Sequence, residues 1–164
     1  MEQHFLKTVE LIEAILQSGT EEAYFEVFEQ YEGDIYQILM IVDWREEDEA
    51  IVEYCEKILQ TGELSVETES ADNAQGFIIR LHYKDQALII PYQGEGADRD
   101  TTLKALNQIL QPDYEIRFCE PSDGSDTLEF IPLPKVLWQK LDQKYSHQID
   151  QLFRRFEPES VFFG

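Results

Sequence analysis

Residues 77–92 read FIIRLHYKDQALIIPY, two apolar runs separated by the polar turn KDQ. β-Branched and aromatic residues, which fit a pleated surface, dominate both runs. The pattern therefore predicts two antiparallel strands, over 77–83 and 87–92, joined as a hairpin. Pro91 has no N–H to donate to a neighbouring strand, so it indicates that the second strand ends there or lies at a sheet edge.

A similar pattern occurs further along the chain. The run YEIRFC at 114–119 and the run TLEFIP at 127–132 flank the turn-forming sequence PSDGSD. They predict a second hairpin, and the alternation over 63–69 predicts a further half-buried strand. We expect the four hairpin strands to lie in one antiparallel sheet. Segment 34–42 is too short and too uniformly apolar for periodicity to decide; we interpret it as a buried strand, with a helix as the alternative.

Five segments carry apolar residues at the spacing of a helix face. They cover 2–17, 20–31, 46–60 and 100–110, with a closing helix that begins at Pro134. Thr20 and Asp100 are predicted N-caps, because their side-chain oxygens can accept the first free amides of a helix. Hairpins interspersed with helices predict an α+β fold, with a mainly antiparallel sheet built from hairpins and helices packed on one face.

No linker rich in Gly, Pro or Ser divides the chain, so residues 1–164 are expected to form a single domain. The acidic helical part covers 1–62, and the hairpin-rich part covers 63–164. The chain has 34 acids and 13 Lys or Arg, for a formal net charge of −21. Residues 1–75 carry 20 acids against three bases, for −17, and residues 76–164 carry 14 acids against 10 bases, for −4.

Such a field repels nucleic acid and anionic membranes and attracts cationic proteins. We therefore expect a basic protein partner, no nucleic acid and no membrane. The start MEQHFLKTVE lacks the basic and apolar regions of a signal peptide. The longest apolar run, at 38–42, is far shorter than the roughly 20 residues that span a bilayer. A cytoplasmic location is the expectation.

The sequence offers no recognisable catalytic, cofactor-binding or metal-binding motif. His4, His82 and His147 are far apart, and neither cysteine belongs to a C-x-x-C pair. Cys55 lies on the apolar stripe of its helix and is expected to be a buried thiol. The loop GEGADRD at 94–100 lacks the last glycine of a phosphate-binding fingerprint and carries acids that would repel a phosphate. We predict no cofactor, no metal site and no enzymatic activity.

The stretch DWREEDEAIVE at 43–53 concentrates acids beside a tryptophan. One interpretation is a solvated helix start, whose acids interact favourably with the helix dipole. The other is a docking surface for a basic partner, with the tryptophan as its anchor. In that case the acids should project into solvent and the tryptophan should be partly accessible. The predicted partner-binding residues are Asp43, Trp44, Glu46, Glu47, Asp48, Glu49 and Glu53.

With its small size, the segment DWREEDE, its acidic first half and its lack of catalytic motifs, the chain resembles the small acidic immunity proteins with which bacteria neutralise nucleases or other basic toxins. It is also similar to many uncharacterised bacterial α+β domains. The resemblance implies an acidic binding protein that neutralises a basic partner such as a toxin. One alternative is a small enzyme or ligand-binding domain with a cleft at the sheet edge. Another is a nucleic-acid mimic, whose acids are spaced like backbone phosphates.

Overall fold

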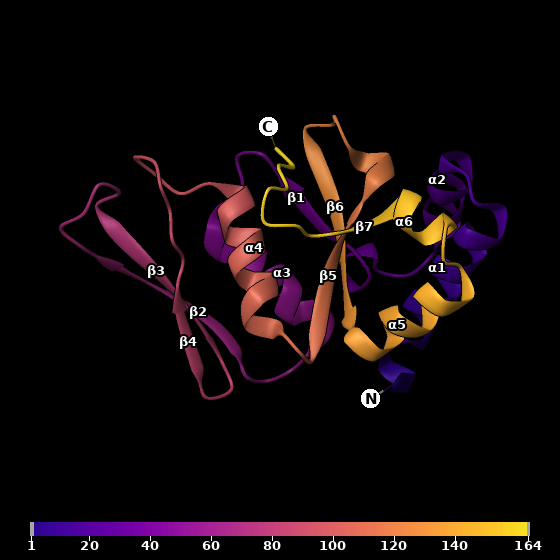
Figure 1. The fold of residues 1–164 in the computed structure, drawn as a ribbon, viewed down its shortest axis with the longest axis horizontal. Helices are drawn as coiled ribbons and strands as arrows, with labels where there is room; N and C mark the ends of the chain where they lie inside the picture. The colour runs from indigo at the N-terminus through magenta and orange to yellow at the C-terminus, as the bar shows by residue number, and fades with distance from the viewer. Residues whose placement is uncertain (1, 164) are drawn as a thin grey trace.

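The computed structural model describes residues 2–163, and Figure 1 shows their arrangement. The helices are α1 (Leu6–Ser18), α2 (Glu21–Gln30), α3 (Asp48–Leu59), α4 (Arg99–Leu110), α5 (Lys135–Lys144) and α6 (Gln148–Leu152). The strands are β1 (Met40–Asp43), β2 (Leu64–Ser70), β3 (Phe77–Tyr83), β4 (Gln86–Ile89), β5 (Tyr114–Cys119), β6 (Thr127–Pro134) and β7 (Phe153–Arg155). Three short 3-10 helices are η1 (Glu2–Phe5), η2 (Ile35–Gln37) and η3 (Glu120–Ser122).

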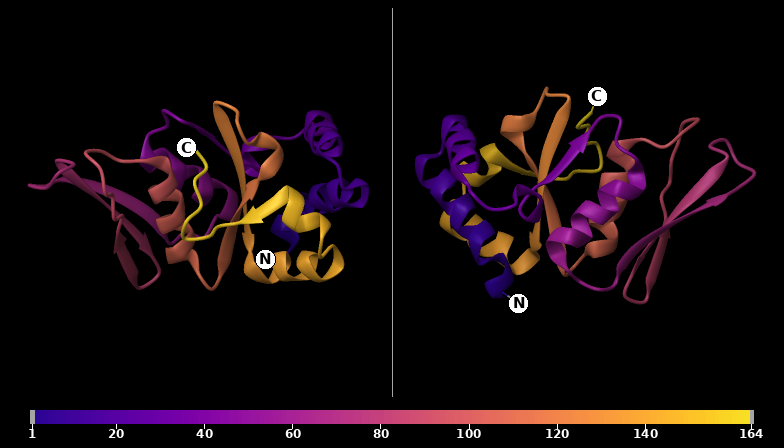
Figure 2. Two further views of the ribbon diagram at one scale, coloured as in Figure 1. Left: turned by 45° about the horizontal axis from the view of Figure 1, so that its top comes forward. Right: turned by 180° about the vertical axis from the view of Figure 1, so that it is seen from behind.

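These strands form two separate sheets, with the orders β1-β6-β5-β7 and β2-β3-β4. Every pairing is antiparallel. The predicted α+β class and the two antiparallel hairpins are therefore confirmed. The expectation of one sheet is wrong, because α3 and α4 pack between the two hairpins and keep them apart (Figures 1 and 2).

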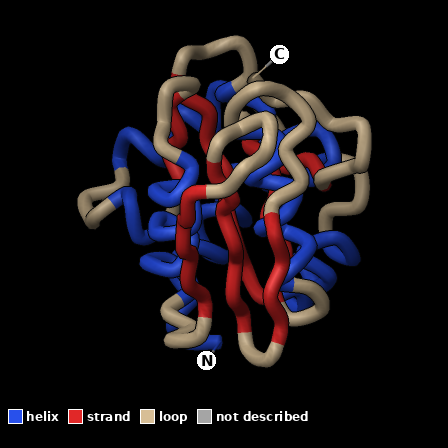
Figure 3. The backbone as a smooth tube through the Cα atoms, turned by 90° about the vertical axis from the view of Figure 1, so that its left-hand side faces the viewer, coloured by secondary structure: helices blue, strands red, loops and turns tan. Residues whose placement is uncertain are grey.

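The molecule is built in layers (Figure 1). The three-stranded sheet lies at one end, followed by α3 and α4, the four-stranded sheet, and the group α1, α2, α5 and α6. Helices thus cover one face of the three-stranded sheet and both faces of the four-stranded sheet. This explains why β5 and β6 are buried on both sides, whereas buried and half-buried residues alternate along β3. The other face of the three-stranded sheet is open, as Figure 3 shows.

Several local predictions are confirmed. The strands 77–83 and 114–119 coincide with β3 and β5. The side chain of Thr20 caps α2 by accepting the Ala23 amide at 3.1 Å. Segment 34–42 divides into η2 and the start of β1, so each of the two interpretations applies to part of it.

The start of α4 differs from the prediction. Its N-cap is Asp98, whose carboxylate accepts the Thr101 amide at 2.7 Å. Asp100, the predicted cap, lies inside the first turn and accepts the amides of Phe162 and Phe163 at 3.0 and 3.2 Å. Asp100 therefore holds segment 156–163 against α4 instead of capping the helix.

Candidate protein-docking surface

Trp44 follows β1 directly and is 50% exposed. Its backbone is fixed from two sides. The N–H donates to the Asp126 carbonyl at 3.1 Å, and the carbonyl accepts from the Arg99 guanidinium at 3.1 Å. The Arg45 guanidinium lies 4.6 Å from the centre of the indole ring. Trp44 is thus a positioned aromatic side chain with accessible surface, which agrees with the expectation for a docking anchor.

The acids around Trp44 differ in their environments. Glu47 and Glu53 are exposed, whereas Asp43, Glu46 and Glu49 are half-buried. Asp43 accepts the Arg45 amide at 2.8 Å, and Glu49 accepts the Thr68 hydroxyl of β2 at 2.9 Å. Glu47 and Glu53 are therefore the members of the predicted set with the freest carboxylates.

Asp48 does not project into solvent, and this part of the prediction is wrong. It is 6% exposed, forms an ion pair with Arg99 at 3.1 Å and accepts the Thr102 hydroxyl at 2.5 Å. Burial raises the pKa of Asp48, while Thr102 and Arg99 act in the opposite direction. The residue joins the first turn of α3 to the first turn of α4. Asp48 can therefore hold these two helix starts together below the surface, but its carboxylate is not accessible to a partner.

Two hollows flank Trp44. The larger, of about 520 Å³, is lined by Trp44, the turn 123–126 and residues 161–163. The smaller, of about 220 Å³, is lined by Trp44, residues 97–100 and Phe163. Neither the turn nor segment 161–163 carries a sequence signal that predicts a role in a site. The turn reaches Trp44 because β1 pairs with β6, in a register that sets Asp43 opposite Thr127.

Another hollow, of about 610 Å³, lies at the β3–β4 turn and is lined in part by η1 and by the end of α3. In it Asp113 accepts from the Tyr83 hydroxyl at 2.7 Å and from the Lys84 ammonium at 2.6 Å. The hydrogen bond from Lys84 is the main cause that lowers the pKa of Asp113, and the same bond raises the pKa of Lys84. Both groups are held in their charged forms, which suits an ion pair and does not suit proton transfer near neutral pH.

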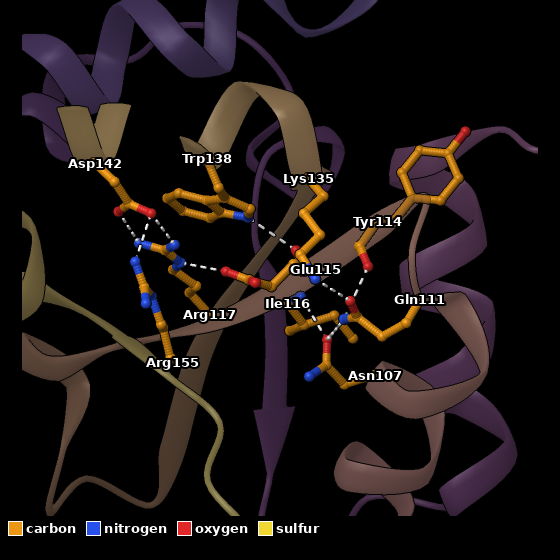
Figure 4. Close-up of polar contacts among 10 residues, drawn as sticks. All are labelled: Asn107, Gln111, Tyr114, Glu115, Ile116, Arg117, Lys135, Trp138, Asp142 and Arg155. Atoms are coloured by element: carbon orange, nitrogen blue, oxygen red, sulfur yellow. Dashed lines mark hydrogen bonds and ion pairs between the residues drawn. The ribbon is translucent and has the colours of Figure 1, made fainter. Parts of the chain in front are cut away.

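A buried charge network joins β5, α5 and β7 (Figure 4). Arg117, only 1% exposed, donates to both carboxylate oxygens of Asp142 at 2.7 and 2.8 Å and to Glu115 at 2.6 Å. Its guanidinium lies 4.5 Å from the Trp138 ring centre, and Arg155 also donates to Asp142 at 2.6 Å. All these groups are engaged with one another, so the network acts as a link between elements of the fold.

Cys55 is buried, as predicted, and Cys119 is buried too. Burial raises the pKa of both thiols, which disfavours the reactive thiolate. Within residues 2–163, no three His, Cys, Asp or Glu side chains are grouped so that they could hold a metal ion. In the same range no helix combines the length and the apolar character needed to cross a membrane.

Comparisons with family models, with curated proteins and with solved structures found no match to this chain.

Proposed function

We propose that this protein is an acidic binding protein that neutralises a basic protein partner, in the manner of an immunity protein acting on a toxin. The observation that carries the proposal is Trp44, half exposed on a fixed backbone, beside two hollows whose linings include the carboxylates of Asp98, Asp100, Asp123 and Asp126. Aromatic side chains that are held in place and ringed by polar groups are typical binding anchors. The carboxylates that line these hollows and the net charge of −21 favour a cationic partner.

Binding would proceed in two stages. The negative field speeds the encounter with a basic surface, since electrostatic steering can raise association rates to about 10⁸ M⁻¹ s⁻¹ or more at low salt. Burial of the Trp44 ring then slows dissociation, because aromatic anchors in desolvated pockets carry much of the binding energy. Glu47 and Glu53 contribute mainly to the first stage, and Trp44 contributes mainly to the second.

The test begins with capture from a native lysate and identification of the protein that co-purifies. Association and dissociation rates are then measured with the purified partner over a salt series. We expect association to slow steeply as salt rises, because exposed charges are screened over about 10 Å at 0.1 M. Trp44→Ala should mainly accelerate dissociation, and Glu47→Gln with Glu53→Gln should mainly slow association. A partner without a basic surface, or an association rate that does not change with salt concentration, would contradict the proposal.

A second candidate is binding of a small ligand in the hollow beside Lys84 and Asp113. Its volume of about 610 Å³ falls in the range of small-molecule sites. It lies at the end of the three-stranded sheet, where a cleft would open between the β3–β4 turn and η1. Ligand-dependent thermal stabilisation that is lost in Lys84→Ala would support this function.

A further inference from the structure

Trp44 does not stand alone on the surface. Val161 is 66% exposed and lines the same 520 Å³ hollow, while Phe162 and Phe163 are more buried and line it as well. We call this hollow, lined by Trp44, residues 123–126 and residues 161–163, the Trp44 hollow. Its apolar wall is therefore shared between the end of β1 and a segment more than 100 positions later in the chain.

The rest of the rim is acidic and comes from the turn 123–126. Asp123 and Asp126 are both exposed, and neither carboxylate forms an ion pair among the described residues. By contrast, the nearby Asp98 caps α4 and Asp100 binds backbone amides. The rim thus leaves two carboxylates ready to accept hydrogen bonds from a cationic group.

The walls of the hollow are held in position. Asp100 binds the amides of Phe162 and Phe163, and Lys104 binds the Pro158 carbonyl at 2.9 Å. The Phe162 ring packs against Phe118 and Phe130, with ring centres 5.1 and 5.4 Å away. Because these contacts exist before any partner binds, little ordering of segment 156–163 would be needed on association.

We propose that the Trp44 hollow receives a basic segment of the partner, with one large apolar side chain against Trp44 and Val161 and flanking Arg or Lys side chains at Asp123 and Asp126. This inference rests on the proposed function and assigns its contact surface. Charge complementarity selects the occupant, because an apolar surface beside two unpaired carboxylates fits a segment that is both apolar and cationic. An acidic segment would be repelled by the two carboxylates, and a purely polar segment would not bury the apolar wall.

The probe is a synthetic peptide in which one leucine is flanked on both sides by arginine and lysine. Two control peptides carry serine in place of the leucine, or glutamate in place of the basic residues. Trp138 is fully buried, so quenching of tryptophan fluorescence by acrylamide reports mainly on Trp44. We expect the leucine peptide to protect Trp44 from acrylamide and both control peptides to protect it far less.

Matched variants separate the hollow from the general field. Asp123→Asn with Asp126→Asn should weaken peptide binding about tenfold, the effect of removing two modest ion pairs. Glu26→Gln with Glu29→Gln removes the same charge from exposed positions on α2, beyond the four-stranded sheet, and should change binding less than about twofold. Val161→Ser should weaken binding, whereas Val136→Ser, at a half-exposed position outside the Trp44 hollow, should not.

Equal weakening by the two charge-neutralised pairs would mean that binding follows net charge alone. That result would overturn the hollow as the site and leave the proposed function standing. Failure of the leucine peptide to protect Trp44 would also overturn the inference. A different result would contradict the proposed function: an identified partner that is not basic, or an association rate that does not depend on salt concentration. Circular dichroism of each variant checks that the fold is retained.

Discussion

Asp48 and Glu47 are neighbours in the sequence with different physical environments. Asp48 is buried against Arg99 and Thr102, whereas the Glu47 side chain is exposed. Asp48→Ala should lower the free energy of unfolding by about 3 kcal/mol, because it leaves the largely buried Arg99 guanidinium without its carboxylate partner. Glu47→Ala should change it by less than about 0.5 kcal/mol. Urea unfolding of both variants measures the difference, and equal losses would contradict the assignment of Asp48 as a structural residue.

Asp142 provides a second test at the residue scale, through pH. Burial acts to raise the pKa of Asp142, but Arg117 and Arg155 outweigh it, so the pKa is lowered. A carboxyl whose pKa is lower in the folded state stabilises the fold above its unfolded pKa of about 3.9. This contribution is lost as pH falls through the folded pKa.

Asp142→Asn should therefore be less stable than the wild type near pH 7, because the buried Arg117 loses its bidentate partner. The difference between the two proteins should begin to shrink as pH falls below about 4, where the unfolded carboxyl takes up its proton, and should reach its minimum below the lowered pKa of the folded state. Urea unfolding at a series of pH values gives this difference directly. A difference that stays constant from neutral to acidic pH would show that the charge of Asp142 is not what stabilises the fold.

At the scale of elements, Asp98 and Asp100 separate two roles at the start of α4. Asp98→Ala removes the N-cap and should cost about 1 kcal/mol of global stability. Asp100→Ala should release the amides of Phe162 and Phe163 and leave the cap in place. Hydrogen exchange should then accelerate at residues 162 and 163 in the Asp100 variant alone. Acceleration at these amides in both variants would mean that segment 156–163 depends on the whole helix start.

The sequence predicts elements best where the pattern is local. The strand 77–83 alternates between a covered and an open face and is bounded by turn residues, so its limits are readable. β7 has only three residues, and it forms because β5 supplies its hydrogen-bond partners. No alternation within 153–155 could reveal this pairing. The division into two sheets is also hidden, because alternation defines the faces of a strand and not its neighbours.

The same limit applies to the candidate site. The local composition of 43–53 indicates an acidic surface with an aromatic anchor, and the exposure of Trp44 agrees with it. The burial of Asp48 depends on Arg99 and Thr102, which lie 51 and 54 positions later. The walls of the Trp44 hollow come from residues 123–126 and 161–163, whose own sequences carry no binding motif. Long-range contacts bring them together, among them the pairing of β1 with β6 and the hydrogen bonds of Asp100.

At the scale of the whole molecule, charge acts on folding and on binding with opposite signs. The net charge of −21 repels itself and opposes the compact state. Most of the ion pairs are at the surface, where each contributes about 1 kcal/mol or less to stability. Screening these pairs with salt therefore removes little of the free energy that stabilises the fold. Raising NaCl from about 20 mM to about 300 mM should therefore increase the urea concentration at the midpoint of unfolding. The same change should slow association with a basic partner, because it screens the field that steers the encounter.

The Glu26→Gln, Glu29→Gln variant provides the control for this pair of salt effects. It removes two repelling charges outside the proposed contact surface, so it should be more stable than the wild type at about 20 mM salt and similar to it at about 300 mM. Its dissociation rate from a basic partner should stay unchanged, since neither residue lies in the Trp44 hollow. A midpoint that falls with added salt would show that paired charges outweigh repulsion in this fold. The excess of acidic over basic residues would then stabilise the fold. It would no longer be an argument for a binding function.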